Sequence, residues 1–464
     1  MMLEPAPSCR SMRSSLVWRL GSLLIMGTGV GACAAAGSRT PPAATTDLTR
    51  IGHIVVIYLE NRSFDNLYGQ FAGADGFATP TAPIAPQLDE SDRPYTALPQ
   101  TDDGGFPAGL PNKPFDITRY IPADRPTQSP VHRFYQEQAQ IDGGRMDRFA
   151  VVSDAKGLVL GYYPTADLPL AAEARTYVLC DRFFHAAFGG SFLNHMWLVA
   201  AATPPFPNAP ASLRVGIDPA GRVFRDGDVT PDDYVVNTAY SRQSPHPQNT
   251  PEDERLPPLR MPTIGDRLSD ASLSWAWFAG GWDDAVAGRA DPSFQYHHQP
   301  FTYFAKYAEG SPARREHLLD ETDFVTRARD GTLPAVSFVK PIGTVNEHPG
   351  YSEIVSSEHH ADSLIDAVRR GPNWKDAVII VTYDENGGFW DHVAPPEGDR
   401  WGPGTRVPTI VISPFAKHGV VDHTIYDTTS ILALIEHRFG LRPLALRDEH
   451  AADLRAALDL SHTP

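Results

Sequence analysis

Two acidic sequences that follow apolar runs carry the residue types best suited to holding a metal ion. Residues 54–59 form a β-branched apolar run that continues into Glu60-Asn61, and residues 378–383 form a second run that continues into Asp384-Glu385. Buried parallel strands have this composition, and their carboxyl ends meet at one edge of a sheet. Carboxylate and amide oxygens that converge there could bind one divalent cation. The alternative is that these acids only cap the helices that follow the strands.

A serine follows two glycines at the start of a further apolar segment. Ser191 comes after Gly189 and Gly190 and begins residues 191–202, which have helical spacing. Glycines let the backbone approach a ligand closely. The free N–H groups at a helix N-terminus favour a phosphate group and a developing alkoxide. Ser191 is therefore a candidate nucleophile. Its alternative role is that of an N-cap, and the two roles are compatible.

Histidines could supply hydrogen bonds and protons beside such a nucleophile. The chain has 17 of them, and the positions of interest are His132, His297-His298 and His348. Phosphoryl transfer needs donors around the phosphate oxygens and an acid for the leaving group, and imidazole provides both between acidic and neutral pH. A single histidine is more often a structural residue, so His359-His360 and His392 are competing candidates.

The order of the predicted elements indicates an α/β fold that would position these groups. Strands are expected at residues 51–60, 176–180, 274–278, 335–339, 378–383 and 407–413. Helices are expected at residues 133–152, 168–174, 191–202, 264–271, 301–307, 318–329, 356–369 and 428–439. The alternation predicts a predominantly parallel central sheet with helices on both faces. Two segments rich in Pro and Gly, residues 72–130 and 203–262, are expected to form loop-rich insertions around the site.

Residues 1–32 have the features of an export signal. Arginines precede an apolar stretch that ends in small residues and is too short and glycine-rich for a membrane span. A lipobox-like sequence leads to Cys33, which predicts lipidation of Cys33 and membrane anchoring; cleavage after residues 34–36 is the alternative. A tether over residues 33–46 and one domain over residues 47–464 follow. The protein is therefore expected in the periplasm, at the cell surface as a lipoprotein, or secreted.

Composition limits the class of protein further. The chain has 464 residues, of which 42% are hydrophobic, so it can bury a sizeable core. Its formal net charge of −16 argues against a nucleic-acid-binding protein, which needs a basic face. Of its three cysteines, Cys180 lies in an apolar run and is expected to be a buried core residue. No disulfide framework is expected.

Four separated motifs resemble those of a known family. They are residues 60–65, 189–195, 384–392 and 406–415, and they occur in the family's order within residues 51–440. The family is the bacterial phosphoesterase family that joins acid phosphatases and phosphatidylcholine-type phospholipases C, in the alkaline-phosphatase-like superfamily. The resemblance implies an alkaline-phosphatase-like fold and an exported hydrolase of phosphoric esters.

The resemblance also implies roles for individual residues. The implied ligands of one divalent metal ion are Glu60, Asn61, Ser191, Asp384 and Glu385. The side chains implied to surround the phosphate are His132, His297, His298 and His348. Ser191 would attack phosphorus and form a phosphoseryl intermediate, since metal coordination lowers the pKa of a hydroxyl. The mostly oxygen ligand set suits calcium, magnesium or manganese and does not exclude zinc or iron.

The substrate is open between a phosphate monoester and a phospholipid diester. Phospholipases of the family generally carry further β-rich domains at the C-terminus, and this sequence ends 25 residues after the predicted helix at 428–439. Members often carry Pro-Thr where this chain has Gly190-Ser191, and the serine form is closer to the acid-phosphatase branch. We expect an acid phosphatase, with phospholipase C as the alternative. A further alternative is an inactive, surface-anchored binding lipoprotein, against which the intact Ser191 and Asp384-Glu385 argue.

Overall fold

The computed structural model describes residues 47–101 and 106–461. The predicted export signal at residues 1–32, the lipidation site Cys33 and the tether to residue 46 lie outside these residues. Among the described helices, none combines the length and the apolar character needed to cross a membrane.

An eight-stranded sheet forms the core of the described chain, in the order β13-β4-β12-β11-β1-β10-β8-β9. Its strands are β1 (His53–Leu59), β4 (Val178–Cys180), β8 (Trp275–Ala279), β9 (Leu318–Asp320), β10 (Val336–Lys340), β11 (Ala377–Tyr383), β12 (Thr409–Ile412) and β13 (Val420–Asp422). Only β12 runs antiparallel to its neighbours, β11 and β4. The predicted α/β fold with a predominantly parallel sheet is therefore confirmed. Cys180, in β4, is fully buried as predicted.

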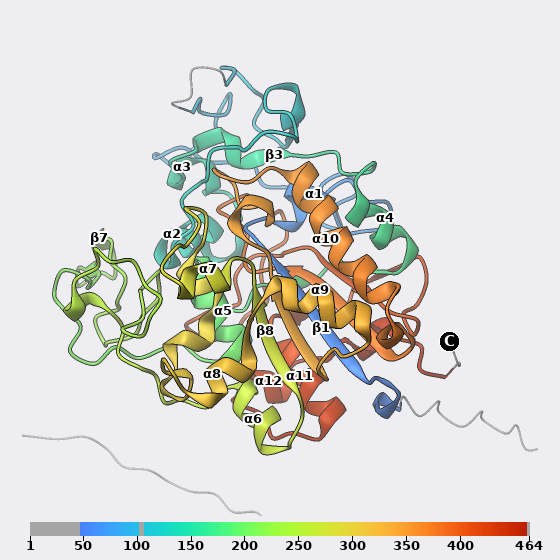
Figure 1. The fold of residues 1–464 in the computed structure, drawn as a ribbon. Helices are drawn as coiled ribbons and strands as arrows, with labels where there is room; N and C mark the ends of the chain where they lie inside the picture. The colour runs from blue at the N-terminus through green and yellow to red at the C-terminus, as the bar shows by residue number, and fades with distance from the viewer. Residues whose placement is uncertain (1–46, 102–105, 462–464) are drawn as a thin grey trace, which may run out of the picture. The chain divides into compact units, whose positions relative to one another are not determined.

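Helices cover the sheet in two layers. In one layer, α10 (Ile354–Arg369) contacts both α4 (Pro169–Thr176) and α9 (Glu321–Asp330). Helices α5 (Ser191–Ala200), α6 (Ile264–Asp270), α11 (Thr429–Phe439) and α12 (Leu446–His450) form the other. Figure 1 shows α9 and α10 in front of the sheet, and α11 and α12 behind it. Both faces of the sheet are thus shielded, which explains why β1 and β11 are apolar along almost their whole length.

Short elements complete the described chain. The remaining helices are α1 (Phe64–Tyr68), α2 (Phe134–Ile141), α3 (Phe149–Val152), α7 (Trp282–Val286) and α8 (Pro312–His317). The remaining strands are β2 (Phe115–Asp116), β3 (Gly161–Tyr162), β5 (Phe183–Phe184), β6 (Gly216–Ile217), β7 (Val223–Arg225) and β14 (Tyr426–Asp427). Short 3₁₀ turns lie at Leu48–Arg50, Ile117–Arg119, Asp142–Gly144, Lys156–Leu160, Glu252–Glu254, Tyr296–His298, Pro300–Tyr303, Ala305–Tyr307, Gly343–Val345, Pro372–Asp376 and Leu454–Ala457.

Three of the predicted helices differ from the structure. The helix expected over residues 133–152 is divided into α2 and α3, because Gly143 and Gly144 take left-handed backbone angles between them. Residues 301–307 form two 3₁₀ turns. The segment expected as a helix from residue 318 begins as strand β9, which adds an edge to the sheet before α9 starts.

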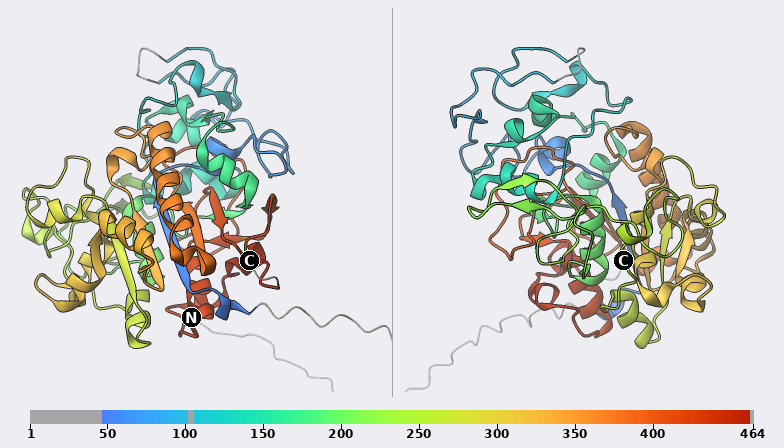
Figure 2. Two further views of the ribbon diagram at one scale, coloured as in Figure 1. Left: turned by 45° about the vertical axis from the view of Figure 1, so that its right-hand side comes forward. Right: turned by 90° about the vertical axis from the view of Figure 1, so that its left-hand side faces the viewer.

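The two segments rich in Pro and Gly contain little regular structure. Residues 72–130 hold only β2 and one 3₁₀ turn in their described part, and residues 203–262 hold only β6, β7 and one 3₁₀ turn. Figures 1 and 2 show both as long loops at the periphery of the sheet, the first in blue to cyan and the second in green to yellow.

Candidate metal and phosphate site

The two predicted acidic strand ends meet in space. Strands β1 and β11 pair in parallel over their full length, with Leu59 opposite Tyr383. The residues that follow, Glu60-Asn61 and Asp384-Glu385, therefore leave the sheet side by side, and all four are buried. The Asn61 N–H donates a hydrogen bond to Asp384 Oδ1 over 3.1 Å. Sheet hydrogen bonding thus fixes the spacing of the two pairs.

Ser191 lies against this group of oxygens. Its Oγ is 3.2 Å from Glu60 Oε2, 3.4 Å from Asn61 Oδ1 and 3.5 Å from Glu385 Oε1. Gly190 occupies the N-cap position of α5, so Ser191 is the first helical residue and the N-cap interpretation is wrong. A Cβ at Gly189 would lie 2.4 Å from the Phe134 backbone nitrogen, so only glycine fits there.

The donor atoms of this site fit a divalent cation. Asp384 Oδ2 and His195 Nε2 are buried without a hydrogen-bond partner. Burial raises the pKa of Asp384 and of Glu385 well above the usual carboxyl range, and each neighbouring carboxylate raises it further. Anionic groups that are buried together need a cation to remain ionised. The Glu60-Asn61 and Asp384-Glu385 pairs with Ser191 are the side chains that would hold it.

Two residues of the site were missed by the sequence analysis. Lys340, the last residue of β10, is fully buried; its Nζ contacts Glu60 Oε1 and lies 3.3 Å from the Leu59 carbonyl. Burial raises the pKa of Glu60, but Lys340 and then His298 outweigh it and hold the pKa well below its usual value. His195 is also fully buried, with Nδ1 2.7 Å from the Ser191 carbonyl and 3.8 Å from Asp384 Oδ2.

The four predicted histidines gather around the serine and the carboxylates. His298 Nε2 is 2.8 Å from Glu60 Oε1, and its ring stacks on His195 at 5.2 Å. His132 Nε2 is 3.2 Å from Asn61 Nδ2, and the His132 and His348 rings are 5.9 Å apart. The His297 ring contacts His298 edge to face at 4.7 Å. The histidine at 298 thus lies on the carboxylate side of the site.

A polar cavity of about 500 Å³ opens onto these groups. Ser191, His132, His297 and His348 line it. Burial lowers the pKa of all four predicted histidines, and it lowers that of His348 to about 3. The imidazoles are therefore neutral at neutral pH, until a bound anion favours their protonation.

Both loop-rich segments contribute to the rim of this cavity. Ser129 and Pro130 come from the first, and Asn237, Thr238 and Tyr240 come from the second. Arg133 also lines the cavity, but its guanidinium is paired with Asp228 at 2.8 Å and with Asp226. This arginine is therefore not free to bind a phosphate group without losing those partners.

The competing histidines lie elsewhere. His392 Nδ1 is 2.6 Å from Asp65 Oδ2, in a separate cluster around Arg406. His360, on α10, is paired with Glu321 at 2.8 Å. His359 and His360 do not line the cavity that contains Ser191. His360 is therefore held by an ion pair outside the site, and His359 is exposed on α10.

The chain belongs to the Phosphoesterase family, whose sequence pattern matches residues 51–442. It is therefore a hydrolase that acts on phosphoric ester bonds. Phospholipase C B of Mycobacterium tuberculosis is 28% identical over 461 residues, which cover 90% of this chain and 79% of that protein. A non-hemolytic phospholipase C of Pseudomonas aeruginosa is 25% identical, covering 85% of this chain and 55% of that protein.

Similarity extends to a plant protein and, weakly, to solved structures. Non-specific phospholipase C1 of Arabidopsis thaliana is 23% identical, covering 89% of this chain and 71% of that protein. A protein in the alkaline phosphatase superfamily from Vibrio parahaemolyticus has a TM-score of 0.33 at 12% identity, covering 72% of this chain and 76% of that chain. A TM-score at this level carries no argument about function.

Proposed function

We propose that the protein is a phospholipase C-type enzyme that hydrolyses phosphodiesters through Ser191 with one divalent metal ion. The observation that carries this proposal is the charge balance of the site. If Glu60, Asp384 and Glu385 are ionised, their three negative charges would be balanced by Lys340 together with one bound divalent cation. The histidines are neutral, and Arg133 is already paired. Such a site suits a phosphodiester, which carries one negative charge, better than a doubly charged monoester at neutral pH.

The reaction would follow from the position of Ser191. Its Oγ would attack phosphorus and form a phosphoseryl intermediate, and water would then release the phosphate product. Glu60 and Glu385 are within 3.5 Å of that Oγ and can accept its proton. His132 and His348 face the cavity. When a bound phosphate anion favours protonation of either imidazole, that imidazole can donate the proton to the leaving oxygen. A bound divalent ion would supply Lewis-acid polarisation of the phosphoryl oxygens.

Acid phosphatase activity is the second candidate, and the buried histidines support it. Below neutral pH, protonation of His132 or His298 would add the positive charge that a monoester dianion requires. Because burial lowers the pKa of both, this activity should rise as the pH falls. The names of the relatives favour the diester substrate, so we place the monoesterase second.

A comparison of kcat/KM for p-nitrophenyl phosphorylcholine and p-nitrophenyl phosphate across pH tests the proposal. We expect the diester to be preferred at neutral pH and the monoester to gain as the pH falls. Activity should disappear with a chelator and return with added metal. A monoester preference at neutral pH would contradict the phospholipase assignment. No turnover of either substrate, with or without added metal, would support the inactive binding lipoprotein instead.

Export and anchoring through Cys33 form a separate part of the proposal, supported by the sequence of residues 1–33. We expect the protein in the membrane fraction of an expressing bacterium, and the Cys33→Ala variant in the soluble exported fraction. Mass spectrometry of the mature N-terminus provides the direct measurement. An unmodified N-terminus after residues 34–36 would establish ordinary cleavage.

A further inference from the structure

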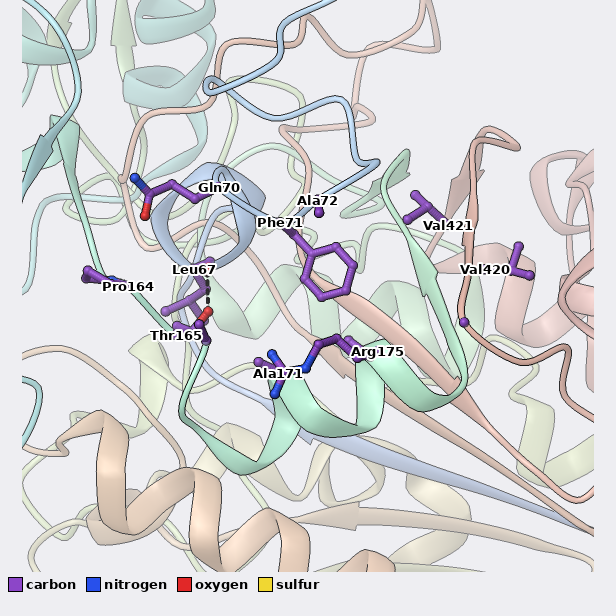
Figure 3. Close-up of a pocket in the computed structure, with 13 residues that line it drawn as sticks. Leu67, Gln70, Phe71, Ala72, Pro164, Thr165, Ala171, Arg175, Val420 and Val421 are labelled. Atoms are coloured by element: carbon purple, nitrogen blue, oxygen red, sulfur yellow. Dashed lines mark hydrogen bonds between the residues drawn. The ribbon is translucent and has the colours of Figure 1, made fainter.

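A second cavity, of about 450 Å³, lies between α1, α4 and β13. It shares no lining residue with the cavity that contains Ser191. Its buried lining includes Leu67, Ala171 and Ala174. Figure 3 shows Phe71 on one side of it and Val421 from the sheet edge on another. The volume falls within the range of small-molecule sites, about 300–1,000 Å³.

One cationic side chain, that of Arg175, lines this apolar cavity. The other polar lining residues have partners: Thr165 donates to the Leu67 carbonyl over 2.6 Å, and Gln70 donates to the Tyr162 hydroxyl over 3.1 Å. Within the described residues, Arg175 makes no ion pair or side-chain hydrogen bond, and it has no carboxylate among the residues that line the cavity. A guanidinium in this position is available to an anion from outside the chain.

We propose that this cavity binds a single-chain amphiphile with a carboxylate head, such as a medium-chain fatty acid. The aliphatic chain would occupy the apolar interior, which is favourable in proportion to the apolar area removed from water. The carboxylate would form paired hydrogen bonds with Arg175, whose planar guanidinium matches carboxylate geometry. The candidate nucleophile and metal ligands all lie outside this lining, so the ligand is bound rather than hydrolysed there. The inference is independent of the proposed function.

Leu67 belongs to α1, which begins shortly after Glu60-Asn61. The floor of the cavity is therefore connected to the metal site through a single short helix.

Isothermal titration of the full-length protein with decanoate tests the proposal. We expect saturable binding that is unchanged by saturating inorganic phosphate, used as the probe for the cavity that contains Ser191. Octanoate should bind roughly tenfold more weakly, because it buries two fewer methylenes. Arg175→Gln should weaken decanoate about tenfold and leave decanol unaffected. The exposed Arg442 lies away from the cavity lining, so Arg442→Gln is the matched control.

Filling the cavity provides the second arm of the experiment. Ala72 and Ala166 line the cavity from exposed positions, so Ala72→Trp and Ala166→Trp should block the chain without disturbing the core. Unaltered decanoate affinity in both tryptophan variants would overturn the location. Equal affinity for decanol and decanoate would overturn recognition of the carboxylate. Absence of binding, or displacement of decanoate by phosphate, would overturn the site itself.

Discussion

Two buried clusters of charged side chains follow the same two strand ends, and they differ in the source of their counterions. The metal cluster consists of Glu60, Asn61, Ser191, Asp384 and Glu385. The arginine cluster consists of Asp65, Asp75, Asp391, His392 and Arg406. In the arginine cluster, Arg406 Nε is 2.9 Å from Asp391 Oδ1 and Nη2 is 3.4 Å from Asp65 Oδ1. The chain itself supplies that cation.

In the metal cluster, cationic side chains neutralise less of the negative charge of the carboxylates. Lys340 contacts Glu60 but is not paired with Asp384 or Glu385, whose pKa values burial raises well above the usual range. Burial also raises the pKa of Asp391, but only to about 6, because Arg406 opposes the shift. Asp391, which is paired with a guanidinium, therefore has a structural role. Asp384 and Glu385, which have no such partner, form a candidate cation site.

The largest expected effect is on kcat, which should depend on the metal cluster and not on the arginine cluster. Ser191→Ala should lower kcat by at least about a thousandfold, since it removes the nucleophile. The matched variant Ser63→Ala lies beside the arginine cluster, where Ser63 caps α1 and donates to the Trp390 carbonyl. It should lower stability by about 1 kcal/mol with kcat nearly unchanged. More than a few per cent of activity in folded Ser191→Ala would refute the nucleophile assignment.

Removal of the internal cation should be the most damaging change to stability. Arg406→Gln leaves Asp391 buried without its guanidinium partner and Asp65 with His392 alone, and it should lower the free energy of unfolding by about 3–5 kcal/mol. Denaturant unfolding of the metal-loaded protein is the measurement. Arg370→Gln, which breaks the ion pair between the exposed Arg370 and Asp366 on α10, should change stability by less than about 1 kcal/mol. Equal effects of the two substitutions would show that Arg406 is not the counterion of that cluster.

Metal content distinguishes the clusters directly. Asp384→Asn should weaken metal binding by roughly 10–100-fold or more, whereas Asp391→Asn should leave the metal content of the folded protein unchanged. Elemental analysis after dialysis against a fixed free-metal concentration measures both. Metal loss in the Asp391 variant with retention in the Asp384 variant would reverse the assignment of the two clusters.

The pH dependence of the free energy of unfolding of the metal-free protein provides a further test of the comparison. Asp384 and Glu385 have folded-state pKa values above those of the unfolded chain, so their contribution to stability is present at low pH and is lost as the pH rises through those values. With chelator present, the free energy of unfolding should therefore fall as the pH is raised from 5 to 8. Added metal should abolish this slope. The same slope with and without metal would contradict the prediction.

The smallest expected effect concerns Lys340. Lys340→Met removes a positive charge beside Glu60, so it should tighten metal binding and weaken binding of inorganic phosphate, each on the order of tenfold. Metal titration and phosphate titration of the same samples measure the two changes. Changes of both affinities in the same direction would show that Lys340 acts through packing rather than through charge.

Much of the site could be predicted because its residues follow apolar strands or paired glycines. Glu60 and Asp384 were predicted to converge, since parallel strands end at a common edge. Lys340 could not be found in this way, because the sequence does not reveal that β10 is the neighbour of β1. His195 was overlooked since a histidine inside an apolar helix has the pattern of a core residue.

The differences between the predicted and the observed secondary structure also have physical causes. Strand β12 is antiparallel to β11, and no helix lies in the connection over residues 384–408, whereas parallel neighbours are usually joined through a helix. No helix is predicted in this connection, and that absence already indicated that β12 could run antiparallel to β11. The division of α2 from α3 was also visible, as the adjacent Gly143 and Gly144. The short 3₁₀ turns near residues 296–307 depend on packing against the core, which local propensity does not record.

The burial of Glu60, Asp384 and Glu385 has a consequence for how the protein would acquire its ion. Side chains with no solvent-accessible surface can exchange a bound cation only through the cavity lined by Ser191 or after local opening of the chain. Exchange would then be slow compared with folding. The ion retained would reflect the metals present in the compartment where the chain first folds, rather than the order of equilibrium affinities. Elemental analysis of protein folded in the presence of different metals would measure this dependence.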